Sequence, residues 1–188
     1  MTQSRGRGRP RDPQVDEAIL EAALELFIEK GAEATSIEQI ARRAGVGKLS
    51  LYRRWETKEE LLAAAIENAR SHMPDVELWD SGEKLAIDIV LDAVSATLAD
   101  PRARGLLAQL IGSSQTHPSL LATYWKHYLG PRRELGGALL RGDDDRDVTM
   151  DMLIGTAFYR VLVHPDELTP AEIRAYLVHL VDRMGVEI

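Results

Sequence analysis

Apolar residues recur at helical spacing along most of the chain, and capping residues, glycines and prolines divide them into separate segments. Runs that alternate apolar and polar residues are scarce, and aromatic residues, which are enriched in strands, make up only 5% of the chain. Ala, Leu and Glu, which favour helices, are abundant. The pattern therefore predicts an all-α fold of roughly nine helices.

The stretch from Thr35 to Lys58 predicts two short helices joined by a tight turn. Ser36 and Gln39 have the spacing of a capping box, in which each side chain bonds the backbone N–H of the other residue and starts a helix. The apolar positions of this helix share one face: Ile37, Ile40, Ala41 and Ala44. Gly45 ends the helix, because glycine readily adopts the left-handed conformation of a tight reversal. A second helix follows over residues 48–54, and this arrangement is typical of a helix-turn-helix, whose second helix enters the major groove of DNA.

The charge of this stretch differs from that of the whole chain. The protein has a formal net charge of −7, whereas residues 34–58 contain six cations and two anions, a local net charge of +4. A basic patch on an acidic protein is typical of a surface that contacts phosphate, and the negative remainder argues against non-specific coating of nucleic acid. A helical hairpin with a solvated cationic face is the alternative that the charges alone leave open.

Residues 12–71 form the predicted helix-turn-helix domain, and residues 1–11 precede it as a basic arm. The arm alternates arginines with glycines, contains nothing that can pack and is predicted to be disordered when free. It either enters an A·T-rich minor groove or acts as a solvated tail that attracts phosphate generally. Asp12 and Pro13 open the first helix, which ends at Gly31 and has an acidic outer face that must point away from DNA.

A recognisable motif spans the second helix of the pair and its flanks, AGVGKLSLYRRWETKEELLAAAI. Leu-Tyr, two basic residues and an aromatic end the helix, and Lys-Glu-x-Leu-Leu follows. The positions concerned are Leu51, Tyr52, Arg53, Arg54, Trp55, Lys58, Glu59, Leu61 and Leu62. This motif resembles that of the TetR family of one-component transcriptional regulators, over roughly residues 14–66. The resemblance implies a homodimer, double-stranded DNA with a palindromic operator as its partner, and an unknown small-molecule effector that relieves repression.

The geometry of a recognition helix, together with the resemblance, assigns roles to individual residues. The N-terminal end of such a helix reaches base edges, so Lys48 can donate to guanine and Leu49 can touch a thymine methyl group. The resemblance implies a phosphate contact for Tyr52. The candidate DNA-binding residues are Ser36, Arg43, Gly47, Lys48, Leu49, Ser50, Tyr52, Arg53, Arg54 and Lys58.

Two positions depart from the common family pattern. Gly47 stands where a capping Ser or Thr is frequent, and Leu49 stands where a small residue is frequent, so the start of the recognition helix is less well defined by the sequence. Leu51 and Trp55 are four residues apart and are expected to face the core.

Residues 80–188 are predicted to form a helical regulatory and dimerisation domain. The domain boundary is expected near residues 70–80, where Pro74 and Gly82 interrupt the helical pattern. Helices are expected over residues 82–98, 101–116, 119–140, 147–162 and 170–184. The helix over residues 119–140 is predicted to be kinked at Gly130–Pro131.

The last two helices have apolar residues on more than one face. The resemblance implies that they pair with their counterparts across a twofold axis, and ordinary core packing is the alternative. A twofold axis also places two recognition helices about 34–36 Å apart, one turn of DNA or a multiple of it. The candidate interface residues are Leu153, Ala157, Val161, Ile173, Leu177, Leu180, Val181 and Met184.

The middle helices contain a mixture of polar and aromatic residues that is compatible with a ligand pocket. The resemblance implies a small, often apolar effector bound between these helices. The candidate ligand-binding residues are Gln109, Ser113, His117, Tyr124, Trp125, Tyr128 and Phe158. The alternatives are aromatic tips that simply lie at the surface and a ligand-independent repressor or architectural DNA-binding protein, which a fully packed second domain would indicate.

The sequence contains no signature of an enzyme. A nucleophile elbow, a Gly-rich phosphate loop and an HExxH motif are absent, and His117 and His127 lack metal-ligand spacing. There are no cysteines, which excludes disulfides and thiolate metal sites. No apolar run approaches the roughly 20 residues that cross a bilayer, and the N-terminus lacks the apolar segment of a secretory signal. We expect a cytoplasmic protein that is not an enzyme, has no cofactor and does not insert into membranes.

Overall fold

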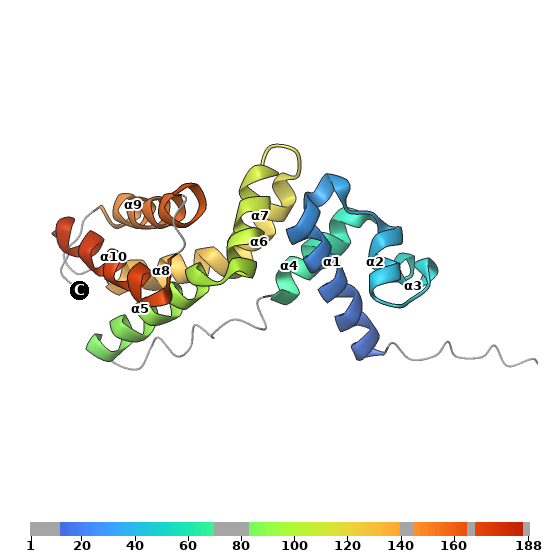
Figure 1. The fold of residues 1–188 in the computed structure, drawn as a ribbon, viewed down its shortest axis with the longest axis horizontal. Helices are drawn as coiled ribbons and strands as arrows, with labels where there is room; N and C mark the ends of the chain where they lie inside the picture. Colours follow the sequence, from blue (N-terminus) through green and yellow to red (C-terminus); the bar gives the residue numbers. More distant parts are fainter. Residues whose placement is uncertain (1–11, 70–82, 140–144, 165–167, 186–188) are drawn as a thin grey trace, which may run out of the picture. The chain divides into compact units, whose positions relative to one another are not determined.

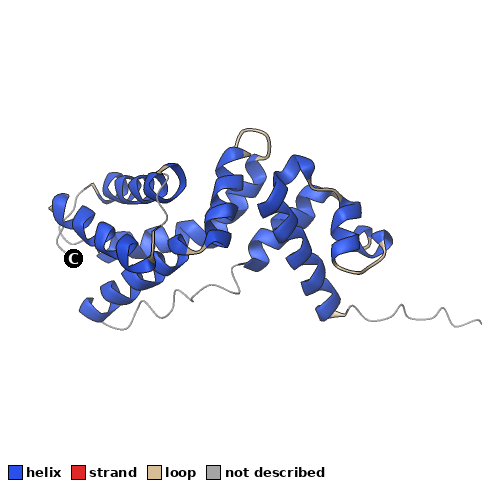
Figure 2. Cartoon of the chain, in the orientation of Figure 1, coloured by secondary structure: helices blue, strands red, loops and turns tan. Residues whose placement is uncertain are grey.

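The computed structural model describes residues 12–69, 83–139, 145–164 and 168–185 (Figure 1). Every regular element in these ranges is a helix (Figure 2), which confirms the prediction of an all-α fold. The predicted basic arm and the loop around residue 143 lie outside the described residues.

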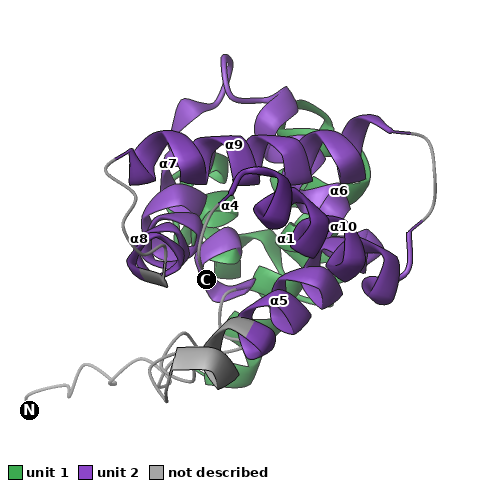
Figure 3. Cartoon of the chain, turned by 90° about the vertical axis from the view of Figure 1, so that its left-hand side faces the viewer, with its two compact units in different colours: residues 1–65 green, residues 66–188 purple. Residues whose placement is uncertain are grey.

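The chain divides into two compact units, residues 1–65 and 66–188 (Figure 3). The division falls within a helix, a few residues before the boundary that the sequence predicts near residues 70–80, and residues 70–82 are themselves outside the described part of the chain.

Helix α1, Pro13–Ala34, begins as the sequence predicts. The side chain of Asp12 accepts a hydrogen bond from the backbone N–H of Gln14, and Pro13 occupies the first turn, where no N–H is needed. Gly31 interrupts the helix with a positive φ of 77°. The regular helix therefore ends at Gly31, as predicted, and a last helical turn follows up to Ala34.

Helix α2, Ile37–Arg43, opens on the predicted capping box, because Gln39 N–H bonds Ser36 Oγ and Ser36 N–H bonds Gln39 Oε1. Gly45 has a φ of 68° and turns the chain toward helix α3. Helix α3, Lys48–Tyr52, is shorter than predicted. Residues 53 and 54 continue it as a turn, in which the N–H groups of Arg54 and Trp55 both bond the carbonyl of Leu51 at 2.9 Å.

Helix α4, Lys58–Ala69, follows a second capping box, formed by Thr57 and Glu60. Its apolar face joins those of α1, α2 and α3 in the core of the first unit, and Leu51 is completely buried there, as predicted. Trp55 is half-buried. The buried apolar residues of this unit are Ile19, Ala22, Ala23, Leu24, Leu26, Phe27, Ala32, Ile37, Ile40, Ala41, Leu51, Leu61, Leu62 and Ala65.

The second unit is formed by the helices after residue 82. Prolines and capping residues start three of them, because Asp100 and Thr169 cap α6 and α10 and a proline occupies the first turn of α6, α7 and α10. The bounds are α5 Glu83–Ala99, α6 Pro101–Gly112, α7 Pro118–Tyr124, α8 Gly130–Leu139, α9 Arg146–Phe158 and α10 Pro170–Arg183. Helix α6 ends four residues before the predicted end at 116, and residues 113–116 form turns instead.

The long helix predicted over residues 119–140 is interrupted by a π-helical turn, η3, Trp125–Leu129. The irregularity precedes the predicted kink because Pro131 has no N–H to bond the carbonyl four residues earlier, so the turn before it widens. Gly130 fits this widened turn closely: a Cβ there would lie 3.0 Å from the Trp125 carbonyl oxygen. A second π-helical turn, η4, Tyr159–Val163, follows α9.

Two arginines link pairs of helices in the second unit. Arg174 of α10 contacts Asp88 and Asp92 of α5, at 2.5 and 2.6 Å, and α5 packs along α10. Arg133 of α8 contacts Asp147 and Asp151 of α9, at 2.7 and 3.0 Å. Helices α5, α8, α9 and α10, which these arginines join in pairs, contribute to the walls of an internal cavity.

Candidate nucleic-acid interface and internal cavity

Helix α3 exposes most of its side chains. Leu49 is 71% exposed and Tyr52 is 48% exposed, whereas Leu51 is fully buried and fixes the helix to the core. Lys48 is exposed and Ser50 is half-buried. A large apolar side chain such as Leu49 at the surface is compatible with contact to a base methyl group, and the arrangement leaves this helix available to enter a groove.

Two of the predicted DNA-binding cations are held by carboxylates at the surface. Arg43 forms a bidentate pair with Glu29, with two N···O distances of 2.8 Å, and this hydrogen bond lowers the pKa of Glu29 and raises that of Arg43. Lys48 pairs with Glu38 and lies 5.5 Å from the ring centroid of Tyr52. The hydrogen bond to Lys48 lowers the pKa of Glu38. Both pairs are exposed and can exchange partners when phosphate is present.

Two further cations of the predicted DNA-binding set are engaged within the unit. The guanidinium of Arg54 bonds Asp16 and donates to the Ser50 carbonyl at 2.9 Å, and its side chain is only 14% exposed. The ammonium of Lys58 donates to the Ala32 carbonyl at 2.7 Å, where α1 ends. Both cations therefore support the packing of α1 against its neighbours, and a phosphate role would require them to leave these partners.

Arg42 and Arg53 are the cations best placed for phosphate. Both are exposed, and in the part of the chain that the structure describes neither side chain is engaged by an ion pair or hydrogen bond. Arg53 belongs to the predicted set, whereas Arg42 was omitted from it. The sequence pattern could have indicated Arg42, because it lies off the apolar stripe of α2, as Arg43 does.

Replacing Glu38 with Gln is expected to strengthen DNA binding by about two- to five-fold, because Lys48 loses its carboxylate partner and becomes available to DNA. Fluorescence anisotropy with a labelled duplex at a fixed salt concentration measures the affinity. Glu134→Gln is the matched control, since it makes the same change in net charge on the exposed face of α8. An effect no larger than that of the control would contradict a competition between Glu38 and DNA for Lys48.

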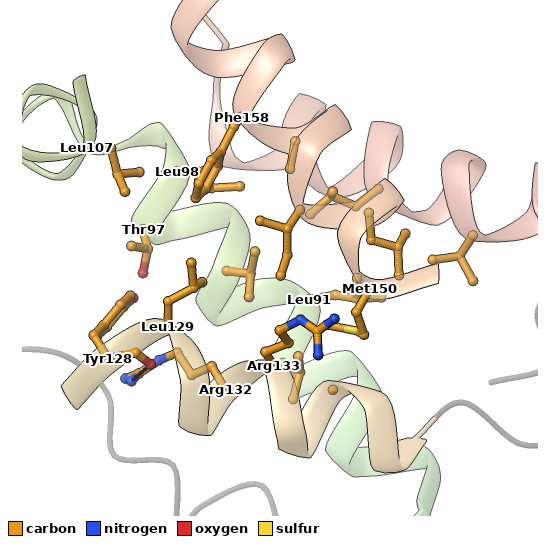
Figure 4. A pocket seen from close by; sticks show the side chains of 18 of the residues that line it. Leu91, Thr97, Leu98, Leu107, Tyr128, Leu129, Arg132, Arg133, Met150 and Phe158 are labelled. Carbon is orange, nitrogen blue, oxygen red and sulfur yellow. Dashed lines mark hydrogen bonds between the residues drawn. The ribbon is translucent and has the colours of Figure 1, made fainter. Parts of the chain in front are cut away.

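The second unit contains a cavity of about 210 Å³ between its helices (Figure 4). Side chains from α5, α6, α8, α9 and α10 and from the α7–η3 segment line it, and most are aliphatic. A cavity of this kind, with apolar walls and few polar groups, is the usual form of a small-molecule site. The described lining residues are Val90, Leu91, Val94, Thr97, Leu98, Leu107, Tyr124, Tyr128, Leu129, Arg132, Arg133, Gly136, Met150, Leu153, Ile154, Ala157, Phe158, Leu177 and Val181.

Three of the seven predicted ligand-binding residues line this cavity: Tyr124, Tyr128 and Phe158. The other four lie elsewhere. Trp125 is 47% exposed, and Gln109, Ser113 and His117 are half-buried outside the lining. Ser113 Oγ instead bonds the Gln109 carbonyl at 2.6 Å, where α6 ends.

The polar side chains of the cavity come from α5, where Thr97 lies, and from α7, η3 and α8. Burial raises the pKa of the Tyr124 hydroxyl well above its usual value, so this hydroxyl stays neutral. The rings of Tyr124 and Tyr128 lie 4.9 Å apart, and the guanidinium of Arg132 lies 3.8 Å from the Tyr128 ring centroid. Neither Arg132 nor Arg133 belongs to the predicted ligand-binding set.

Most of the predicted dimer-interface residues lie in the core of the chain itself. Ile173, Leu177 and Val181 of α10 are 1–8% exposed, and Ala157 and Val161 are equally buried. Their burial within the single chain leaves little of their surface to a partner, and their place in a dimer interface stays a prediction. Leu153 lines the cavity, and Leu180 and Met184 are half-buried. The exposed apolar residues of the same segments are Val148, Met152, Tyr159, Val163 and Val178.

The first unit defines the class of the protein: two short helices meet at a glycine turn, and the second exposes basic, apolar and phenolic side chains, as in helix-turn-helix DNA-binding proteins. A family model described as bacterial regulatory proteins of the tetR family matches residues 19–65, and a model described as a tetracyclin repressor-like C-terminal domain matches residues 86–182. The chain belongs to the TetR family and is a DNA-binding transcriptional regulator, which is not an enzymatic role.

Relatives extend the likeness over most of the chain. The HTH-type transcriptional regulator YdeS of Bacillus subtilis is 32% identical over 179 residues, 89% of this chain and 88% of its own. A negative transcriptional regulator of the biofilm operon icaADBC, IcaR of Staphylococcus epidermidis, is 27% identical over 111 residues, 59% of each chain. A crystal structure of a TetR-family regulator from Mesorhizobium loti shares the fold with a TM-score of 0.76, covering 96% of this chain and 100% of its own at 19% identity.

Within the described ranges, no three His, Asp or Glu side chains come together in a group that could hold a metal ion. Each helix of those ranges is also too short or too polar to cross a bilayer.

Proposed function

We propose that this regulator is a homodimeric repressor that binds a palindromic operator and is released by a small molecule bound in its second unit. The observation that carries this function is the presence, in one chain, of an exposed recognition helix and of a separate apolar cavity. A protein that only bound DNA would have no need of that cavity, since an unfilled apolar space lowers stability. The cavity therefore favours this function over a ligand-independent repressor. Cytoplasmic location follows from access to DNA in a bacterium.

A twofold dimer is supported by a stripe of exposed apolar residues along α9 and η4. Val148, Met152, Tyr159 and Val163 lie at spacings of four and seven residues, which places them on one face of the helix, and each is more than half exposed. Gly155 lies in the middle of this stripe, and a Cβ there would meet nothing within 4 Å in its own chain. Glycine weakens a helix interior by about 1 kcal/mol, so close approach of a partner helix is a physical reason for its presence.

The contacts that specify DNA are proposed for the exposed residues of the first unit. Lys48 and Leu49 face the bases, while Tyr52 and Arg53 contact phosphate; Arg42 is added to the phosphate set on the basis of its exposure. Two such surfaces in a dimer read two half-sites related by the twofold axis of the protein.

Selection of random duplex DNA by the purified protein, at a stated salt concentration, tests this function. We expect an enriched palindrome whose half-site centres are about one helical turn, or a multiple of it, apart. Enrichment of a single unpaired half-site would contradict the dimer. Weak binding without any enrichment would contradict sequence-specific regulation.

A further inference from the structure

The cavity wall includes two arginines, and the protein itself engages the guanidinium groups of both. The terminal nitrogens of Arg133 donate to Asp147 Oδ1 at 2.7 Å, to the Asp147 carbonyl at 2.9 Å and to Asp151 Oδ1 at 3.0 Å. Its Nε is buried and cannot be reached from the cavity. Arg133 therefore leaves mainly the methylene groups of its side chain to line the wall.

Arg132 and Thr97 are also engaged within the chain. The Arg132 guanidinium lies 3.8 Å from the centroid of the Tyr128 ring, and its Nη1 donates to the Tyr128 carbonyl at 3.3 Å (Figure 4). The Thr97 hydroxyl donates to the Ala93 carbonyl of its own helix at 2.9 Å. Among the described residues of the wall there is no carboxylate, so a ligand cation would find no counter-ion there.

The burial of Tyr124 shows how unfavourable a charge is at this wall. Tyr124 is 6% exposed, and this burial raises the pKa of its hydroxyl well above the usual value. The cause is the free-energy cost of forming an anion where water is excluded. A carboxylate or an ammonium of a ligand would meet the same cost, because the described residues of the wall offer it no unengaged partner of opposite charge.

The volume of the cavity limits the size of a ligand. At about 210 Å³ it exceeds the roughly 150 Å³ of an apolar cavity that takes up benzene, and it is below the about 300–1,000 Å³ typical of sites for drug-sized molecules. In proportion to benzene, it holds about eight or nine non-hydrogen atoms. Water is a poor occupant of such a space, because a buried water molecule needs about two to four polar partners, whereas hydrocarbon gains dispersion contacts with aliphatic walls.

We infer that the effector is an uncharged, hydrocarbon-like molecule of about eight or nine non-hydrogen atoms, held by burial of its apolar surface and not by a charged head group. This inference rests on the proposed function, since it names the ligand class of the same regulatory site. Selectivity comes from size and from exclusion of charge, because the cationic side chains of the wall are already engaged by the protein.

Calorimetric titration of the full-length protein with octanol, octanoate and octylammonium tests the ligand class, because the three share one alkyl chain and differ in the head group. We expect octanol to bind at least about ten-fold more tightly than either ion, since only the ions must give up hydration without gaining a partner. Equal or tighter binding of octanoate or octylammonium would overturn the inference, as would absence of binding by octanol.

A series of straight-chain alkanols from butanol to dodecanol tests the limit of size. We expect the affinity to rise by about four-fold for each added CH₂ group, through burial of hydrocarbon, until the chain fills the cavity near octanol. Longer alkanols are expected to gain no further affinity, because additional carbons do not fit the space. A steady rise through dodecanol would overturn the inference, because a cavity of this volume limits chain length.

Two leucines of α6 provide a matched pair of variants. Leu107 lines the cavity and is 4% exposed, whereas Leu110 is fully buried outside the lining. Leu107→Ala enlarges the cavity, so we expect the chain length of the tightest-binding alkanol to increase by about two or three carbons. Leu110→Ala makes the same chemical change in the same helix, and we expect it to leave the preferred chain length unchanged. An unchanged preference in folded Leu107→Ala, or an equal shift in both variants, would overturn the inference.

The comparison of head groups needs no variant, so the inference can be tested even if Leu107→Ala does not fold. Operator binding, measured on the same preparations, separates the ligand class from the proposed function. Specific DNA binding without octanol binding would remove this ligand class and leave the regulator intact. Octanol binding without any specific DNA site would refute the proposed function and leave the site for an uncharged ligand standing.

Discussion

Replacing Met152 with Arg is expected to weaken the dimer at least about hundred-fold, since burying an unpaired guanidinium in an apolar interface opposes association by about 3 kcal/mol or more. Met152 is 52% exposed at the centre of the stripe formed by Val148, Tyr159 and Val163. Met152 is about half exposed in the single chain, so the new guanidinium can reach solvent and the fold of the chain is retained. Sedimentation equilibrium measures the dimer, and binding to a palindromic site is expected to fall in parallel.

The control for this experiment is Ile111→Arg. Ile111 is 44% exposed on α6 and lies outside the stripe, so the same substitution adds the same charge at a position of similar exposure. We expect it to leave the dimer unchanged. A Met152→Arg protein that sediments as a dimer with wild-type affinity would place the interface elsewhere.

Replacing Leu51 with Ala is expected to destabilise the first unit by about 2–5 kcal/mol, because it removes a fully buried side chain and leaves a cavity under the recognition helix. A loss of this size is a large part of the total stability of a small domain, so DNA binding is expected to be lost with the fold. Chemical denaturation followed by circular dichroism measures the change.

Leu49→Ala is the matched control, since it makes the same chemical change two residues earlier in the same five-residue helix. Leu49 is 71% exposed, and its removal is expected to change stability by less than about 0.5 kcal/mol. Its effect is expected in DNA binding alone, as a weaker preference at one position of each half-site. Equal destabilisation by the two variants would contradict the assignment of Leu51 to the core and Leu49 to the DNA surface.

Helix starts in this chain could be predicted because the interactions that create them are local. The capping boxes at Ser36 and Thr169 join residues three apart, and both form as the sequence indicates. Gly45 forms the turn for a similar reason, since its positive φ depends on the residue itself and not on distant partners. The motif around Tyr52 also indicated the TetR family. The family models that match residues 19–65 and 86–182 then established this membership.

The partners of the cations could not be predicted in this way. Arg54 meets Asp16 across 38 residues of sequence, and Lys58 meets the Ala32 carbonyl across 26. A count of charges between residues 34 and 58 treats Arg54 and Lys58 as available to DNA. In the folded chain both side chains bind groups of α1 instead. The positions that remain open for phosphate, such as Arg42, are recognisable only after those pairs are known.

The amino-acid sequence by itself determined the helical class, the helix-turn-helix and most helix boundaries, because periodicity, caps and glycine turns act over three to seven residues. Only the tertiary structure decided which faces of the last helices are buried and which residues line the cavity. Apolar side chains such as Ile173 and Met152 look alike in a helical pattern, and packing alone makes the first 1% and the second 52% exposed. The position of Arg133 at the cavity wall likewise depends on α8 lying against α9, which no local signal encodes.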